Sequence, residues 1–116
     1  SSAASDVYKR QYLEDVQYTI YNGTDEGFYN WHHDTFWAGE KAYDRKISVI
    51  IQLSNPSDYE GGQFLLDEQY EQPNATQLTQ RGTVLCFPSF ILHTVKPVTK
   101  GTRKSLVAWI EGPKFR

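Results

Sequence analysis

The stretch KISVIIQLS, Lys46 to Ser54, is a strongly β-branched run. Valine and isoleucine favour extended backbone, and the run is apolar on both faces near its centre, as in a strand that is covered on both sides. The turn-forming residues NPSD at 55–58 follow and stop it. We therefore predict a strand over 46–54 and work outward from it.

On both sides of this strand the dominant hydrophobic period is two, which is typical of strands and not of helices. Further strands are expected over 16–21, 28–34, 63–67, 75–80, 83–88, 91–98 and 103–110. Turns are expected over 22–27, at Arg81-Gly82 and at Lys100-Gly101, and Gly61-Gly62 precedes the strand over 63–67. The sequence shows no internal repeat and no pattern typical of a long helix.

Seven or eight short strands with turns between them predict an all-β sandwich or barrel. Within that class the double-sheet jelly roll, or double-stranded β-helix, has a hollow end that suits a metal. Composition alone does not separate it from an immunoglobulin-like sandwich. The candidate site residues favour the jelly roll.

Composition narrows the function classes. The 116 residues suit one domain, and 39% hydrophobic residues are enough for a packed core. The net charge of -2 gives no basic footprint for nucleic acid, and no apolar run is long enough to span a membrane. The single cysteine, Cys86, lies in the apolar run VLCFP and is expected in the core. Nothing indicates secretion, so a cytoplasmic location is favoured; the oligomeric state stays open.

The first eleven residues, SSAASDVYKRQ, differ from the rest because they show no hydrophobic period. We interpret residues 1–11 as a non-native leader left by processing of the DNA sequence. Residues 12–116 are then expected to form a single catalytic domain that is truncated at its N-terminus.

The stretch NWHHDT, Asn30 to Thr35, contains the first candidate metal ligands. In a strand, residues i and i+2 point to the same face, so His32 and Asp34 can reach one ion while His33 points away. Taken alone, this pair is more often a polar strand end near a loop. A third ligand would change that balance.

His93, in SFILHTVKPV, is the remaining histidine. Alone it would be interpreted as a buried core histidine. Together, His32, Asp34 and His93 match the two-histidine, one-carboxylate facial triad of non-haem Fe(II) oxygenases, which leaves coordination positions open. A structural zinc site would close its fourth position, usually with cysteine, and Cys86 is the only one available.

Such a metal needs electrons to activate O₂, and 2-oxoglutarate is the common source. Its far carboxylate requires a cation at a fixed distance, and arginine binds carboxylates through two parallel hydrogen bonds. Arg103 opens the last predicted strand, and the Lys-Gly turn would place it beside the strand of His93. Ser105 shares its face and can donate to the same carboxylate, whereas Lys104 faces away. The alternative for Arg103 is a solvated strand end.

The order HxD, then GG before a strand, GTVLxFPS, HxVxPVxxGxR and a tryptophan resembles the Fe(II)/2-oxoglutarate-dependent dioxygenases, in particular the prolyl 4-hydroxylase-like branch with its bacterial and phage members. The resemblance covers about residues 18–112. It implies His32, Asp34 and His93 as iron ligands and Arg103 as the partner of the 2-oxoglutarate C5 carboxylate.

The same resemblance implies further roles. Tyr21 and Trp109 are expected to line the pocket for cosubstrate and substrate, although Trp109 also suits an aromatic core plug. Gln52 departs from the family, which often has a bulky residue there. Helices that precede the HxD strand in the family are missing from the sequence, which leaves an apolar sheet face exposed.

The resemblance therefore implies an iron enzyme that hydroxylates peptidyl proline, with Fe(II), 2-oxoglutarate and O₂ required and ascorbate as a candidate additional cofactor. The expected partner is a peptide or protein substrate, with selection residing in loops 35–45 and 68–74. Three alternatives stay open: hydroxylation of another peptide residue or of a free small molecule, a jelly-roll binding module without turnover, and a structural zinc protein.

Overall fold

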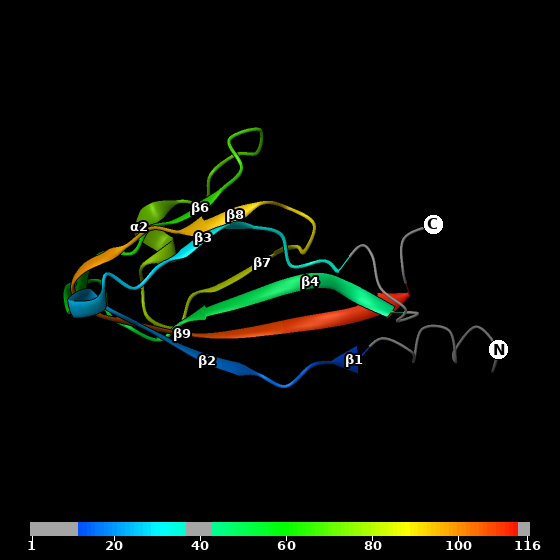
Figure 1. Ribbon diagram of the computed structural model, residues 1–116, viewed down its shortest axis with the longest axis horizontal. Coiled ribbons are helices and arrows are strands. Elements are labelled where there is room, and N and C mark those ends of the chain that lie inside the picture. Colours follow the sequence, from blue (N-terminus) through cyan, green and yellow to red (C-terminus); the bar gives the residue numbers. More distant parts are fainter. Residues whose placement is uncertain (1–11, 37–42, 114–116) are drawn as a thin grey trace.

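The computed structural model describes residues 12–36 and 43–113 (Figure 1). Its strands are β1 (Tyr12–Leu13), β2 (Gln17–Asn22), β3 (Tyr29–His32), β4 (Tyr43–Gln52), β5 (Tyr59–Gly61), β6 (Phe64–Leu66), β7 (Val84–Pro88), β8 (His93–Val95) and β9 (Val98–Pro113). Its helical segments are the 3-10 turns η1 (Gly23–Asp25) and η2 (Pro56–Asp58) and the single α-helical turn α2 (Ala75–Leu78).

The strands form two antiparallel sheets that face each other as layers (Figure 1). The large sheet is organised by β9, whose 16 residues pair with β4 on one side and with β2 and β1 on the other. Strand β7 pairs with β4, and β5 pairs with the start of β9. The small sheet has the order β3-β8-β6. This architecture confirms the predicted all-β jelly roll.

The core lies between the layers. Along β4, Ser48, Ile50 and Gln52 are buried and face the small sheet, as expected from strand alternation. The buried apolar cluster consists of Tyr21, Ile50, Phe64, Leu66, Phe87, Ile91, Val95 and Val98. Polar side chains at positions 48 and 52 flank the apolar stretch 49–51 of β4, and both lie near the candidate site.

Two local predictions are wrong. Residues 75–80 do not form a strand: Ala75–Leu78 is a helical turn that is capped by Asn74, whose side chain accepts a hydrogen bond from the backbone N–H of Gln77. A capping interaction therefore overrides the alternating pattern. Lys100-Gly101 is not a turn either, because β9 continues through it, with Gly101 at a φ of 73°.

Cys86 is exposed, which contradicts its expected place in the core. It alternates with the buried Phe87 on β7 and therefore faces outward. Apolar side chains are exposed on the outer surface at both edges of the large sheet: Tyr18 and Ile20 on β2 are 51% and 49% exposed, and Val84 on β7 is 55% exposed. An exposed apolar sheet face was expected. The prediction for Cys86 was wrong because the apolar strand was assumed to be covered on both faces.

The proposed leader, residues 1–11, and Trp37 of the predicted selection loop lie outside the described residues. Within the described part of the chain, no helix has the length and apolar character that crossing a membrane requires.

Gly101→Ala is expected to lower the free energy of unfolding by about 2–4 kcal/mol. Its positive φ disfavours any side chain, and an added Cβ would overlap the backbone of Asp58 and Tyr59. Chemical denaturation of Gly101→Ala beside Gly82→Ala checks this. Gly82 has a φ of 88° but no atom within 4 Å of an added Cβ, so its alanine variant should lose only about 1 kcal/mol. Equal losses in the two variants would contradict the overlap.

Candidate metal centre and cosubstrate pocket

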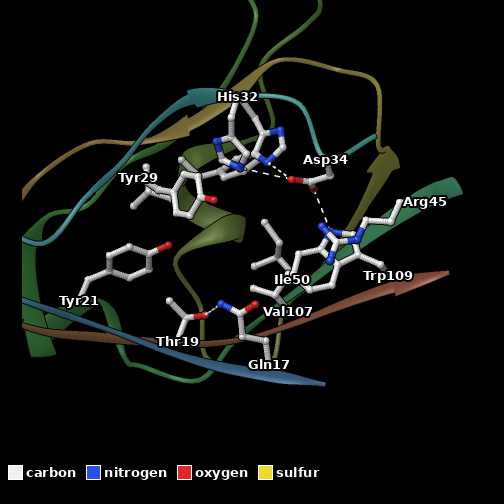
Figure 2. A pocket seen from close by; sticks show the side chains of 13 residues that line it. Gln17, Thr19, Tyr21, Tyr29, His32, Asp34, Arg45, Ile50, Val107 and Trp109 are labelled. Carbon is white, nitrogen blue, oxygen red and sulfur yellow. Dashed lines mark hydrogen bonds and ion pairs between the residues drawn. The ribbon is translucent and has the colours of Figure 1, made fainter. Parts of the chain in front are cut away.

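His32, Asp34 and His93 converge at one end of the space between the sheets (Figure 2). His32 ends β3 and pairs directly across the small sheet with His93, which begins β8. Asp34 lies just beyond β3, where its backbone N–H donates to the carbonyl of Ser89. The Asp34 Oδ1 atom is 3.2 Å from Nε2 of His32 and 3.4 Å from Nε2 of His93. His33 points elsewhere and contacts Thr35.

The hydrogen bonds of the imidazoles decide whether this cluster suits a metal. Nδ1 of His32 lies 2.7 Å from the carbonyl of Asn30, and Nδ1 of His93 lies 2.8 Å from the carbonyl of Ile91. Carbonyls accept only, so each Nδ1 carries a proton, and in its neutral form each ring presents the Nε2 lone pair to Asp34. The Asp34 oxygen and the two Nε2 atoms then face one another with lone pairs and no proton between them. A cation bound among them would remove this electrostatic repulsion. The residues therefore fit a divalent metal such as Fe(II).

The second oxygen of Asp34 is held by Ser48, which sequence reasoning missed, and by Trp109, which was expected to line the pocket. Oδ2 accepts hydrogen bonds from Ser48 Oγ at 2.5 Å and from Trp109 Nε1 at 3.0 Å, and Ser89 Oγ lies 2.9 Å from Ser48 Oγ. These donors occupy Oδ2, so Oδ1 is left to face the imidazoles. The available signal was Ser48 itself, a polar residue on the inward face of the apolar run KISVIIQLS.

The same contacts set the charge of Asp34. Burial opposes ionisation, whereas the hydrogen bonds that Oδ2 accepts from Ser48 and Trp109 favour the charged form and help to hold the pKa of Asp34 below its usual range. The carboxylate is therefore ionised throughout the neutral range, as a metal ligand must be.

Ser48→Ala is expected to weaken Fe(II) binding by about 10- to 100-fold, since the carboxylate loses a hydrogen bond that orients it. An anaerobic Fe(II) titration of the variant measures this. Ser57→Ala, which removes an exposed hydroxyl from η2, is the matched control and should bind as the unmodified chain does. An unchanged affinity in Ser48→Ala would show that Trp109 alone orients Asp34.

Arg103 is 4% exposed and therefore is not a solvated strand end. It pairs across the sheet with Tyr21, and its guanidinium carbon lies 5.5 Å from the centre of the Tyr21 ring. No acidic side chain among residues 12–36 and 43–113 forms an ion pair with it. A buried cation without an acidic partner in this part of the chain suits an anionic ligand.

The prediction that the strand of Arg103 lies beside the strand of His93 is wrong. Strand β9 does not return beside β8; it belongs to the opposite sheet and pairs with β2 and β4. Ser105 is buried on the same side as Arg103, and Lys104 is exposed on the other, as alternation predicts. Arg103 thus belongs to the sheet opposite that of His93 and is not its neighbour within one sheet.

The metal cluster opens into a cavity of about 290 Å³ that Tyr21, Ile50, Phe64, Val107 and Trp109 help to line (Figure 2). Arg103 lies in an adjoining cavity of about 190 Å³, and Phe64 lines both. Burial raises the pKa of Tyr21, against the lowering effect of Arg103, so its hydroxyl stays protonated and can donate. The predicted pocket residues Tyr21 and Trp109 therefore both lie on the cavity wall.

Two further residues shape these cavities. Gln52 is buried beside Arg103 and donates to the hydroxyl of Tyr59 at 2.9 Å, so its amide extends the polar end of the smaller cavity. Arg45 lies over the ring of Trp109 at 3.8 Å and forms a paired salt bridge with Glu14 at 2.8 and 3.0 Å. Sequence reasoning missed Arg45 because its partners are 31 and 64 positions away.

The fold and the donor set define a jelly-roll protein with a two-histidine, one-carboxylate metal cluster and a buried arginine behind it. The family described as the 2OG-Fe(II) oxygenase superfamily matches residues 16–111, and the chain belongs to this family.

Known relatives and solved structures agree with this membership. A PKHD-type hydroxylase of Gloeothece citriformis is 37% identical over 83 residues, which cover 72% of this chain and 37% of the relative. The chain thus spans well under half the length of that relative. Viral collagen prolyl hydroxylase from Paramecium Bursaria Chlorella virus-1 shares the fold with a TM-score of 0.71 at 19% identity, over 97% of this chain and 63% of that one.

A prolyl hydroxylase from Trichoplax adhaerens, solved in complex with a hypoxia inducible factor oxygen degradation domain peptide fragment, also shares the fold. Its TM-score is 0.64 at 21% identity, over 85% of this chain and 44% of that chain. At these identities the two structures establish the fold alone.

Proposed function

We propose that this chain carries the catalytic centre of an Fe(II)- and 2-oxoglutarate-dependent dioxygenase that hydroxylates peptidyl proline. The observation that carries the proposal is the pairing of a metal-ready cluster, formed by His32, Asp34 and His93, with the buried Arg103, which has no ion pair among the described residues. When bound, Fe(II) and 2-oxoglutarate would together reduce O₂, with 2-oxoglutarate becoming succinate and CO₂ and the substrate C–H bond becoming C–OH.

The residues of the chain have separate tasks in this proposal. His32, Asp34 and His93 hold the metal on one side and leave the cavity side open. Arg103, whose guanidinium lies against the Tyr21 ring, binds the far carboxylate of 2-oxoglutarate. Ile50, Phe64 and Val107 form an apolar wall that limits access of water to the reacting groups.

A peptide substrate is supported by the prolyl hydroxylases that share the fold, one of them with a bound peptide fragment. Gln17 and Thr19 of β2 and Tyr29 of β3 line the main cavity with polar groups (Figure 2). A free amino acid would leave much of this polar wall unused. Proline as the hydroxylated residue rests on the relatives and not on a contact within the cavity.

The test is anaerobic addition of Fe(II) and 2-oxoglutarate, followed by observation of the visible charge-transfer band of the chelate. We expect a band that appears only when both Fe(II) and 2-oxoglutarate are present. After admission of air, it further expects succinate and a proline-containing peptide heavier by one oxygen atom. A folded chain that forms no band contradicts the oxygenase function, whereas succinate formed without peptide oxidation contradicts only the choice of substrate.

A further inference from the structure

The backbone of β2 presents unused hydrogen-bonding groups beside the main cavity. Lys104, on β9, directs both its backbone groups toward β4: its N–H donates to Ser54 Oγ at 2.7 Å and its carbonyl accepts from Leu53 at 3.0 Å. Ile20 lies directly opposite Lys104 in the antiparallel ladder. The two residues therefore form a non-hydrogen-bonded pair, and the N–H and carbonyl of Ile20 point away from β9.

The same direction repeats every second residue of the strand, so the backbone groups of Tyr18 also point outward. The backbone groups of Asn22 point outward in the same way, but its carbonyl accepts a hydrogen bond from the N–H of Gly27 at 3.0 Å. The outer edge of β2 is therefore already paired at Asn22. Within residues 12–36 and 43–113, no hydrogen bond reaches the outward groups of Tyr18 or Ile20. The open edge therefore spans these two residues.

The opposite border of the cavity is closed to such pairing. Strand β3 also lies at a sheet edge, but its own side chains occupy its backbone groups. The carbonyl of Asn30 faces Nδ1 of His32 at 2.7 Å, and the Asn30 side chain accepts from the N–H of Trp31 at 2.9 Å. Of the two edge strands that line the cavity, only β2 has an edge available in the described residues.

We propose that the peptide substrate binds as an added antiparallel strand along β2, with the target residue opposite Thr19; this rests on the proposed function. Residues directly opposite each other in an antiparallel pair share a face. Because Thr19 lines the main cavity, the target side chain also points into it. The two neighbouring substrate residues lie opposite Tyr18 and Ile20 and exchange hydrogen bonds with them.

This register explains how the strand accommodates proline. The backbone of Thr19 is bonded to β9, so the substrate residue opposite it directs its own N–H away from β2. Proline has no N–H and therefore loses no ladder bond at that position, whereas at either neighbouring position it would lose one. Proline also restricts the preceding residue to extended backbone, as strand addition requires.

The register is tested with a fluorescein-labelled peptide, Ser-Thr-Val-Pro-Val-Thr-Ser, and two series of backbone N-methyl variants. Binding is measured by fluorescence anisotropy with Fe(II) and 2-oxoglutarate under argon, so that no turnover occurs. N-methylation of either valine should weaken binding at least about fivefold, since each change removes one ladder hydrogen bond. N-methylation of either threonine, whose N–H faces away, should leave the affinity within about twofold.

A variant of the chain tests the other side of the pairing. Ile20→Pro removes the outward N–H but leaves the ladder with β9 intact, and it should weaken peptide binding at least about fivefold. Val84→Pro is the matched control, because Val84 lies on the edge strand β7 at the far side of the large sheet. The charge-transfer band serves as the folding check for both variants.

The outcomes separate the two proposals. Peptide binding that is equally sensitive, or equally insensitive, to N-methylation of valine and threonine overturns the strand pairing and leaves the oxygenase function standing. A chain that forms the band but binds none of the peptides overturns the peptide substrate together with the strand. If Ile20→Pro fails to form the band, the N-methyl series still decides the register.

Discussion

Asp34→Asn should abolish Fe(II) binding and at the same time stabilise the metal-free chain. In the unmodified chain, Asp34 Oδ1 faces two Nε2 lone pairs, at 3.2 and 3.4 Å. An asparagine keeps the shape, can accept from Ser48 and Trp109 through its oxygen, and turns its NH₂ group toward the two imidazoles. The repulsion is replaced by hydrogen bonds, each worth about 1 kcal/mol, while the anionic ligand is lost.

Thermal unfolding with and without Fe(II) under argon measures both effects. At Fe(II) 100-fold above its Kd, the unmodified chain should gain about 2.7 kcal/mol from the metal, and Asp34→Asn should gain nothing. Asp67→Asn, which changes an acidic residue of another loop, is the control for charge alone. A metal-free Asp34→Asn chain that is less stable than the unmodified one would mean that the histidines donate to Asp34 and that the cluster is a structural hydrogen-bond network.

The sequence predicted the parts of the site that depend on local spacing. His32 and Asp34 are two residues apart, and strand alternation places such residues on one face, although Asp34 in fact follows the strand end. With three histidines in the chain, His93 was the remaining candidate for the second imidazole. The alternation of Arg103, Lys104 and Ser105 was likewise readable because β9 is regular there.

Other parts depend on contacts that spacing does not encode. Whether an apolar strand is covered on one face or on two depends on the layers around it, so Cys86 was placed in the core although it faces outward. The partners of Asp34 come from β4 and β9, 14 and 75 positions away. The path of β9 through Gly101 depends on the close approach of Asp58, which requires the whole chain.

The short capped turn α2 shows a different reason why a prediction from sequence fails. Residues 75–80 alternate as a strand does, yet Asn74 caps a helical turn whose register also lets Thr83 Oγ1 donate to the carbonyl of Gln77. In four residues, period two and period 3.6 differ by few positions, so a single side-chain hydrogen bond decides between them.

Arg103→Met should raise the Kd for 2-oxoglutarate by about 30- to 4000-fold, the range expected when one partner of a buried, hydrogen-bonded charge pair is removed. The affinity for Fe(II) should stay unchanged, because Arg103 is not among the contacts of His32, Asp34 or His93. Titration of the charge-transfer band with 2-oxoglutarate at saturating Fe(II) measures the first quantity. Arg103→Lys keeps a point charge but not the planar fork, so it should fall between the two.

Lys104→Met is the matched control, since it removes the same charge from the adjacent residue, whose side chain faces solvent. It should leave the Kd for 2-oxoglutarate within about twofold at physiological salt, where exposed charges are largely screened. Similar losses in both variants would mean that net charge and not the buried guanidinium attracts the cosubstrate. Arg103→Met should also unfold no more readily than the unmodified chain without ligands, because it removes a buried cation that lacks an acidic partner in the described residues. A marked loss of stability would instead show that Arg103 holds the two layers together, and the anion site would then have to be sought elsewhere in the cavity.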